Sequence, residues 1–156
     1  MLVLRKMTEE EFPEYKENAV ANYAADLMRA GDLPEAETKK LAEDAFQTPL
    51  SEGVHSLDHY LFSIFESGTN TKVGSLWLGK RKTAARESAF IYDIYLFENF
   101  RGKGYGEMTM RLAEAEAIRL GLKSIGLHVF GHNQAAKRLY DKLGFHVTNL
   151  MMRKEL

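Results

Sequence analysis

The chain has 156 residues and a formal net charge of −1; 45% of the residues are hydrophobic, 28% are charged, three are prolines and none is cysteine. This length and composition predict one compact domain over residues 1–156 and exclude a disordered or fibrous chain. The lack of cysteine excludes disulfides, thiol nucleophiles and thiolate metal ligands, so the chemistry must use oxygen and nitrogen groups.

The hydrophobic pattern alternates between the helical and the strand repeat along the chain. Thr8 and Glu11 have the spacing of a capping box, which predicts a helix start, and Gly31 marks the end of that helix. Asn133 is placed to cap the last helix, which Gly144 ends. The order predicts a single α/β unit with a mixed sheet. In chain order, the predicted elements are a strand at 2–5, helices at 11–30 and 35–46, strands at 60–65, 73–78 and 89–97, a helix at 106–120, a strand at 124–130, a helix at 133–143, and strands at 145–147 and 150–153.

Neither a targeting segment nor a membrane span is predicted. The first charge, at Arg5, follows only four apolar residues, which is shorter than the apolar region of a secretory signal. The longest apolar stretches elsewhere have four residues, against about 18 in a membrane helix. We therefore expect a cytoplasmic protein with no membrane partner.

Charge is unevenly distributed along the chain. Residues 1–58 hold 13 acidic and 6 basic residues, whereas residues 59–156 hold 9 and 15. The acidic part favours a cationic ligand and the basic part a polyanionic one, unless these charges only cover solvated helix faces. The Lys and Arg residues are scattered, so nucleic acid is not an expected partner. The histidines lack metal-ligand spacing, and no metal is expected.

Residues 101–106, with the sequence Arg-Gly-Lys-Gly-Tyr-Gly, lie between a predicted strand and a predicted helix. Glycine destabilises regular structure by about 0.5–1 kcal/mol, so this cluster indicates a tight turn or a ligand that approaches the main chain closely. The helix start offers free N–H groups and a partial positive charge, to which Arg101 and Lys103 add full charges. This segment, named the glycine loop, predicts a phosphate site. Its spacing fits neither the dinucleotide pattern nor the P-loop.

Two motifs resemble those of the GCN5-related N-acetyltransferases, the GNAT family. Arg101-x-x-Gly104-x-Gly106, after a strand and before a helix, looks like the acetyl-CoA signature of that family. The run from Leu127 to Phe145 is similar to the strand, Asn, helix, Tyr and Gly-Phe ending that follow it. The motif match covers about residues 89–147, and the order of elements fits nearly the whole chain.

The resemblance implies a mixed, mostly antiparallel central sheet of six or seven strands flanked by four helices. Strands four and five would splay apart and leave a cleft for acetyl-CoA as co-substrate. Main-chain groups of the fourth strand would pair with the pantetheine arm, and the glycine loop would hold the pyrophosphate. Asn133 would also bind the pantetheine, and the small Ala136 would leave room for it. The cofactor-binding residues implied are Ile94, Tyr95, Leu96, Arg101, Gly102, Lys103, Gly104, Tyr105, Gly106, Glu107, Asn133 and Ala136.

Transfer of an acetyl group to an amine needs a base and an acid. An alkylamine has a pKa near 10 and must lose a proton, and a departing thiolate is stabilised by a proton donor. The resemblance assigns the acid to Tyr140. His128 or Asp93 would serve as the base, and deprotonation through a water chain is an equal alternative. The resemblance is weakest at His128, because some relatives have Glu there.

The sequence therefore predicts an acetyltransferase that passes the acetyl group of acetyl-CoA directly to a primary amine of a small molecule or peptide. The acidic first part of the chain favours a cationic acceptor. A non-catalytic acyl-CoA-binding or sensing module is the alternative, because it would keep the glycine loop and need neither Tyr140 nor a base. Transfer of a longer acyl chain is a further alternative. An exposed terminal strand also favours a homodimer.

Overall fold

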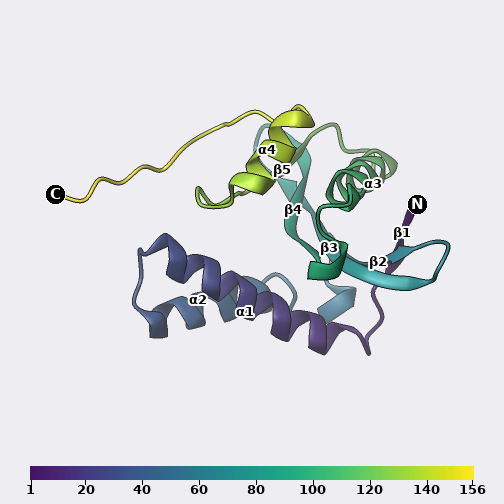
Figure 1. Cartoon of the computed structure of the whole chain (residues 1–156), viewed down its shortest axis with the longest axis horizontal. Coiled ribbons are helices and arrows are strands. Elements are labelled where there is room, and N and C mark those ends of the chain that lie inside the picture. The colour runs from purple at the N-terminus through teal and green to yellow at the C-terminus, as the bar shows by residue number, and fades with distance from the viewer.

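The computed structural model describes all 156 residues. Five strands form one sheet in the order β1-β2-β3-β4-β5, and all neighbours are antiparallel except β4 and β5. Helices α1 and α2 cover one face of the sheet, and α3 and α4 lie on the other (Figure 1). The elements are β1 (Leu2–Lys6), α1 (Phe12–Ala30), α2 (Glu35–Gln47), the 3₁₀ turn η1 (Gly53–His55), β2 (His59–Glu66), β3 (Thr71–Lys82), β4 (Glu87–Leu96), the 3₁₀ turn η2 (Glu98–Phe100), α3 (Tyr105–Arg119), β5 (Ile125–Leu127) and α4 (Gln134–Lys142).

The helix signals predicted from the sequence are confirmed. The N–H of Thr8 donates to Glu11 Oε2 at 2.9 Å, and the N–H of Glu11 donates to Thr8 Oγ1 at 3.3 Å, which is the reciprocal pair of a capping box. Gly31 ends α1 with a left-handed φ of 79°. Asn133 Oδ1 accepts a hydrogen bond from the N–H of Ala136 at 3.2 Å and so caps α4.

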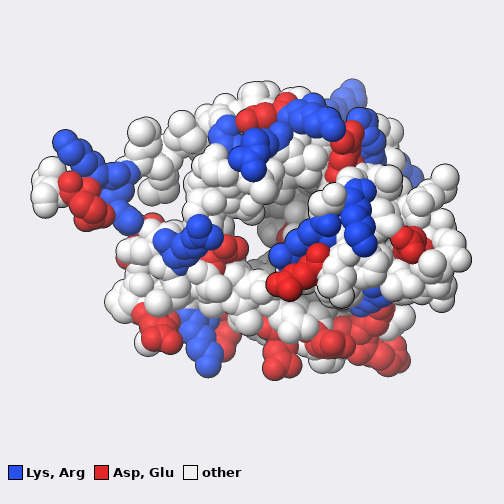
Figure 2. All heavy atoms as spheres, in the orientation of Figure 1, with Lys and Arg blue, Asp and Glu red and all other residues white.

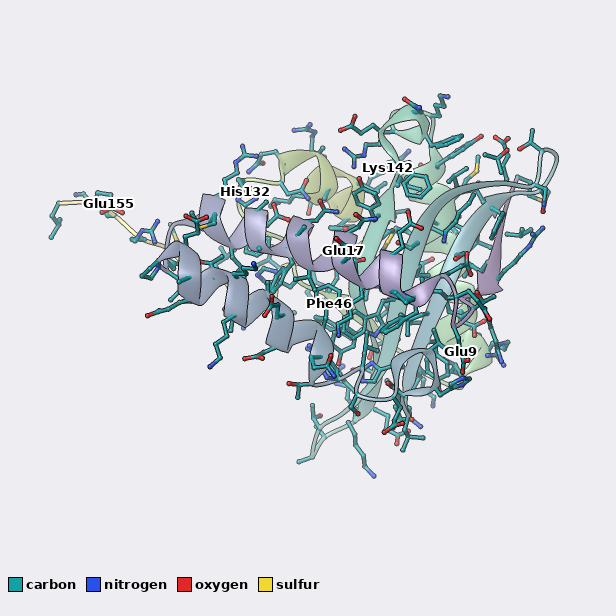
Figure 3. All side chains as sticks on the ribbon, turned by 90° about the horizontal axis from the view of Figure 1, so that it is seen from below. Glu9, Glu17, Phe46, His132, Lys142 and Glu155 are labelled. Atoms are coloured by element: carbon teal, nitrogen blue, oxygen red, sulfur yellow. The ribbon has the colours of Figure 1, made fainter.

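The two faces of the sheet carry two separate hydrophobic cores. Alternate residues of a strand face opposite sides, so Leu61 and Trp77 pack under α1 and α2, whereas their neighbours Phe62 and Leu76 pack under α3. Phe46 of α2 lies between the helices and the sheet, with its ring 5.3 Å from that of Trp77 (Figure 3). The sheet is therefore buried on both sides, which fixes the two helical layers relative to one another.

A β-bulge lies in the middle of β4. Trp77 is opposite Asp93 but the next residue of β3, Leu78, is opposite Ile91, so Tyr92 is the extra residue. The pairing of β4 with β5 ends at the same level, with Ile91 opposite Leu127, while β4 continues to Leu96. The fourth and fifth strands therefore part beyond this point, as predicted.

The prediction of six or seven strands is wrong. Residues 145–147 and 150–153 have a strand-like pattern, but they pair with no strand of the chain. They belong to an extended C-terminal segment that leaves the fold after α4 (Figure 1). The predicted strand at 124–130 is also shorter than expected, because its pairing with β4 stops at Leu127. A strand pattern needs a free sheet edge within reach, and that is a property of the tertiary structure.

None of the helices combines the length and the apolar composition that a membrane span requires.

Candidate active site

The glycine loop presents an unbroken row of free N–H groups. Arg101 N–H donates to the Glu98 carbonyl at 3.1 Å, and Met108 N–H donates to the Gly104 carbonyl at 3.2 Å. Between these two donors, the six N–H groups from Gly102 to Glu107 have no acceptor in the protein, and no side chain caps the helix. Free donors at the start of a 15-residue helix form a site for an anion.

The glycines of the loop allow its left-handed backbone angles and leave one side of it open to a ligand. Gly102 and Gly104 have φ values of 71° and 80°, a region that side chains with a Cβ rarely adopt. No atom lies within 4 Å of a Cβ built on either residue, so this side of the loop is open. A Cβ on Gly106 would instead lie 3.1 Å from Leu139 of α4, so this glycine allows α3 and α4 to approach closely.

The loop is flanked by polar side chains with different partners. Arg101 and Lys103 are exposed, and each lies over an aromatic ring, those of Tyr95 and Phe100. The carboxylate of Glu107 pairs with basic side chains of α3 and α4, and its pKa is lowered mainly by the hydrogen bond from the lysine of α4. The Tyr105 hydroxyl donates to a β2 carboxylate. The positive charge at the loop therefore comes from Arg101, Lys103 and the helix terminus.

The end of β4 has one free edge where β5 has parted from it. The N–H of Phe97 is bonded to β3 at 2.9 Å, and bonded and non-bonded pairs alternate in an antiparallel ladder. Tyr95 is therefore bonded to β3, whereas the main-chain groups of Ile94 and Leu96 face the cleft. The Leu96 carbonyl already accepts from Arg101 Nε at 2.8 Å. Among the three predicted pantetheine contacts, the Ile94 carbonyl and the Leu96 N–H are therefore free on this side, whereas Tyr95 bonds to β3.

Asn133 and Ala136 are the remaining predicted cofactor contacts. Asn133 uses its carboxamide oxygen to cap α4, so its NH₂ group is free to donate. Ala136 lies one turn before Tyr140 on the same helix face and is half-buried. Asn133 therefore caps α4 and Ala136 lies in its first turn, and Figure 1 draws this helix beside β5.

Asp93 is held by a tyrosine of α1. The Tyr15 hydroxyl donates to Asp93 Oδ2 at 3.0 Å. Burial raises the pKa of Asp93 from 3.8 to about 6, together with the nearby charge of Asp26, although the bonds from Tyr15 and the Ile94 N–H oppose the rise. The bulge turns Asp93 to the α1 side of the sheet, next to Tyr92 on the same side. A carboxylate that titrates near neutrality can act as a base.

Tyr140 presents its hydroxyl to open space although its ring is buried. The residue is only 9% exposed and packs in the core with Phe145. Its hydroxyl has no hydrogen-bond partner, and no buried side-chain oxygen lacks a partner, so this oxygen must be reachable from outside. Burial raises the pKa of Tyr140, and the charge of Asp93 raises it further. The phenol is therefore protonated at neutral pH and close enough to Asp93 to sense its charge.

The other predicted base, His128, has no such surroundings. It lies beyond the end of β5 and is exposed, although a position within a half-buried strand was expected. Its ring meets Phe130 edge-on at 4.8 Å, and no acid orients it. Of the two predicted bases, Asp93 is thus the one that a neighbouring side chain orients, whereas His128 has no such partner. Nor do any three His, Cys, Asp or Glu side chains gather as a metal site would require.

A cavity of about 360 Å³ lies between α1 and the ends of β3 and β4. Asp93 and Tyr95 line it from the sheet, so it adjoins the cleft where the strands part. Ser75 is only 7% exposed, its hydroxyl has no partner, and it lines the same cavity. The other lining residues are Glu11, Glu14, Tyr15, Asn18, Ala19, Ala21, Asn22, Lys72 and Phe97. None of these, nor Ser75, was predicted, because they come from segments distant in sequence.

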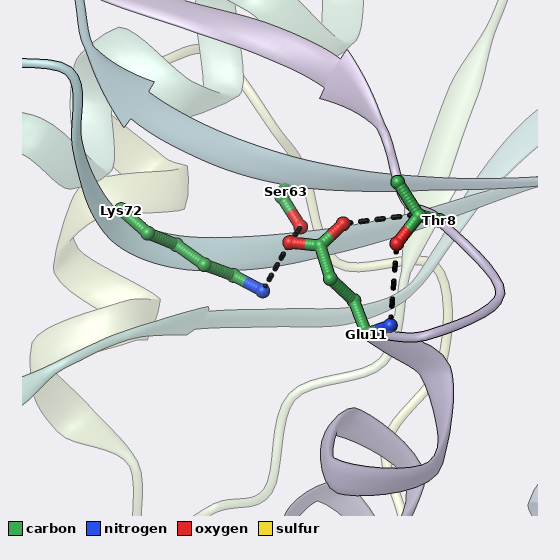
Figure 4. A network of polar contacts seen from close by, with 4 residues as sticks. All are labelled: Thr8, Glu11, Ser63 and Lys72. Atoms are coloured by element: carbon green, nitrogen blue, oxygen red, sulfur yellow. Dashed lines mark hydrogen bonds and ion pairs between the residues drawn. The ribbon is translucent and has the colours of Figure 1, made fainter.

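One end of the cavity carries a closed ion pair (Figure 4). Glu11 Oε1 accepts from Lys72 Nζ and from Ser63 Oγ, both at 2.8 Å, and Glu11 Oε2 accepts from the Thr8 N–H. Burial alone would raise the pKa of Glu11, but the bonds from Lys72, Thr8 and Ser63 lower it from 4.5 to about 2. Lys72 and Glu11 therefore neutralise each other. Glu14 makes no ion pair and is the uncommitted charge beside them.

Charged side chains are also unevenly distributed on the surface of the molecule. Figure 2 shows a deep opening on one face of the molecule, with Lys and Arg side chains prominent along the upper side of it, over α4 and the nearby loops. Asp and Glu side chains are more numerous over the lower part of the molecule, where α1 and α2 lie, with Lys and Arg side chains also standing beside the opening. An anion is thus favoured at the upper side and a cation at the lower one.

Known proteins resemble the chain over nearly its whole length. The model of the acetyltransferase (GNAT) family matches residues 10–145. The chain is 36% identical over 153 residues to the uncharacterised N-acetyltransferase YdgE of Bacillus subtilis, covering 98% of this chain and 97% of that protein. It is 33% identical to YycN of the same organism, whose crystal structure, titled a putative acetyltransferase, superposes with a TM-score of 0.92 and covers 100% of this chain and 99% of that one. A family model over most of the chain and full-length relatives lead to one conclusion: the chain belongs to the GNAT family and is an N-acetyltransferase.

Proposed function

We propose that this enzyme transfers the acetyl group of acetyl-CoA directly to a primary amine of a small cationic acceptor. The observation that carries the proposal is the row of six free N–H groups beside two parted strands, where β4 carries Asp93 and α4 carries Tyr140. The first group suits a pyrophosphate, and the pair of side chains suits a proton donor and a proton acceptor.

Different groups around the cleft bind the pyrophosphate and the pantetheine arm of acetyl-CoA. The N–H groups of the glycine loop hold the pyrophosphate, and Arg101 and Lys103 add charge around it. The Ile94 carbonyl and the Leu96 N–H, which remain free on this side, pair with the amides of the pantetheine arm, as an added strand would. Asn133 donates its NH₂ group to the same arm from above, where Ala136 leaves space. This places the acetyl end of the arm near the bulge of β4.

Asp93 and Tyr140 handle the protons of the transfer. Bound acetyl-CoA supplies the thioester, whose carbon–sulfur bond breaks as the bond from the amine nitrogen to the acetyl carbon forms. Asp93 accepts the proton that the amine loses, directly or through water, because its pKa of about 6 leaves it ionised at neutral pH. Tyr140 donates its proton to the departing sulfur, because its own pKa keeps it protonated. His128 is not needed for either step.

The cavity beside α1 is the proposed acceptor site. Its volume of about 360 Å³ admits a small molecule or one extended side chain. The Glu11–Lys72 pair contributes no net charge, so Glu14 and Asp93 make the cavity negative. The unpartnered Ser75 hydroxyl can accept or donate a further hydrogen bond. These groups favour an acceptor that carries a second cationic group besides the reacting amine.

The test is release of free coenzyme A with a panel of amines. Diamines, monoamines of equal length and amino acids would be compared at pH 8, with the Tyr140→Phe variant and calorimetry of coenzyme A binding as companions. We expect release with the wild type, greatest for diamines, and intact binding in the variant. Binding without release from any amine would instead indicate an acyl-CoA sensing module. No binding of coenzyme A would refute the assignment of the glycine loop.

A further inference from the structure

A polar contact joins helix α1 to the loop between β5 and α4, on the side of the cleft where β5 has parted from β4. His132 Nε2 of the loop donates a hydrogen bond to Asp26 Oδ1 of α1 at 2.8 Å, although the two residues are 106 positions apart. The His132 side chain is only 17% exposed, so its ring is enclosed. Figure 3 shows His132 beside the C-terminal half of α1. This contact, named the Asp26–His132 bridge, holds the loop against the helix.

Packed aromatic rings support the bridge. The Phe130 ring stacks on that of His132, with the centroids 5.3 Å apart and the planes at 13°. The same Phe130 ring lies 6.1 Å from the ring of Tyr23, which precedes Asp26 by one helical turn. Tyr23 in turn meets Phe46, a buried residue of α2, at 6.2 Å. The loop is therefore anchored to the layer of α1 and α2 by a polar contact and by a chain of rings.

The bridge stands where the proposed acceptor cavity ends. Tyr15, Ala19 and Asn22 line the cavity from one face of α1. Asp26 follows Asn22 by four residues and lies on the same face, yet it does not line the cavity. Burial and, less strongly, the charge of Asp26 raise the pKa of Asp93, so Asp26 is near the proposed base. The cavity thus stops one helical turn before the bridge.

The cavity has an ion pair or a bridge at each end along α1. The Glu11–Lys72 pair closes one end, and the Asp26–His132 bridge lies at the other. Tyr15 holds Asp93, so the reacting amine would bind at the level of Tyr15. Tyr15 and Asn22 are seven positions apart, which is about 10 Å along a helix, and the distance to Glu11 is shorter. A linear acceptor that extends further than this from its reacting amine must meet one of the two closed ends.

We propose that the Asp26–His132 bridge is the end wall of the acceptor site and limits the length of the amines that the enzyme acetylates. This limit rests on the proposed function, because it takes the cavity as the acceptor site. A short acceptor fits between the two ends, whereas a longer one binds only if the bridge opens, which removes its hydrogen bond and disturbs the stacked rings. His132 also precedes Asn133, so one loop carries both the end wall and a contact of the pantetheine arm.

The test compares two linear diamines of different length, 1,4-diaminobutane and 1,12-diaminododecane, by release of free coenzyme A at pH 8. The short one fits within the available length and the long one exceeds it. In the wild type we expect kcat/KM to be about tenfold lower or less for the long diamine, as expected when a hydrogen bond must be broken for binding. His132→Ala opens the end of the cavity while Asp26 keeps its charge. The ratio of the two kcat/KM values should therefore rise about tenfold in favour of the long diamine, through a lower KM.

Two variants serve as controls. His132→Gln keeps a side-chain N–H that can donate to Asp26, so it should restore the wild-type preference for the short diamine. His55→Ala removes a similar contact, with Glu9, from an exposed place outside the cavity, and should leave the preference unchanged. Thermal unfolding checks that each variant is folded. A loss of stability alone would lower the rates with both diamines together and would not change their ratio.

The outcomes separate the length limit from the activity itself. If the wild type uses both diamines equally well, or if His132→Ala keeps the wild-type preference, the end wall is refuted while acetyl transfer stands. If neither diamine leads to release of coenzyme A, the proposed function is wrong and the length limit is refuted with it.

Discussion

Removing the hydroxyl of Tyr15 is expected to move the acidic limb of the pH–rate profile. Asp93 must be ionised to accept a proton, so kcat/KM should fall as the pH drops below its pKa of about 6. The bond from Tyr15 stabilises the ionised carboxylate, and Tyr15→Phe removes that bond while the buried ring stays in place. Burial still raises the pKa of Asp93, and the bond from Tyr15 no longer lowers it. The acidic limb of the pH–rate profile therefore moves to higher pH.

The size of the shift follows from the geometry. Hydrogen bonds to charged groups contribute about 1.5–3 kcal/mol, and one pKa unit corresponds to about 1.36 kcal/mol. The 3.0 Å distance is long for a bond between a hydroxyl and a carboxylate, which favours the lower figure and a shift of about one unit. At pH 6 the ionised fraction of Asp93 would fall from about one half to about one tenth, and kcat/KM about fivefold, with little change at pH 8.

The assay is kcat/KM for one amine between pH 5 and 9, with stability followed by thermal unfolding. Tyr23→Phe is the matched control, because Tyr23 lies on the same helix and makes no hydrogen bond to Asp93. An acidic limb that stays in place in Tyr15→Phe, or that moves as far in Tyr23→Phe, would refute the role of Asp93. Asp93→Asn should remove the limb and lower the rate by about 10²–10⁴.

The remaining predictions concern four other residues. Tyr140→Phe should lower kcat by about 10²–10⁴ and leave the calorimetric affinity for coenzyme A unchanged. Gly104→Ala should cost about 1–2 kcal/mol at its left-handed φ, which thermal unfolding measures, and weaken coenzyme A binding. Glu11→Gln should lower the free energy of unfolding by about 2 kcal/mol at pH 7, allowing for partial exposure. Because the folded-state pKa of Glu11 is depressed, urea unfolding should show this difference fully above about pH 4.5 and lose it towards pH 2. Glu14→Gln should raise KM for a diamine about tenfold and not for a monoamine, whereas Glu17→Gln, outside the cavity, should change neither.

Local signals in the sequence account for most of the correctly predicted fold. A capping box at Thr8, a stop at Gly31 and a cap at Asn133 each act within a few residues of the helix end that they mark, so they can be recognised without the tertiary structure. Strand pattern is different, because it says only that a segment would pair if an edge were available. For this reason residues 145–153 were predicted as strands, although they pair with no strand of the chain.

The candidate site also has one part that local sequence reveals and one part that depends on the tertiary structure. The glycine loop could be predicted because its glycines, charges and helix start are adjacent in sequence. The bond between Tyr15 and Asp93 joins residues 78 positions apart, and nothing in either segment indicates the other. Choosing between Asp93 and His128 likewise required knowing which of them is enclosed, since either residue type can act as a base.

The bulge in β4 makes the position of the carboxylate depend on a count of residues. Tyr92 and Asp93 both turn towards α1, although neighbours in a regular strand turn to opposite sides. If Tyr92 were deleted, Asp93 would stay opposite Trp77 and Ile91 opposite Leu78, so a regular ladder would replace the bulge and the neighbours would keep their faces. If Ile91 were deleted instead and residues 93–96 kept their pairing, Tyr92 would stand opposite Leu78 and its ring would be carried to the face under α3. Deletion of Tyr92 should therefore keep the register on both sides of the bulge, whereas deletion of Ile91 should turn a large phenol ring into the other core.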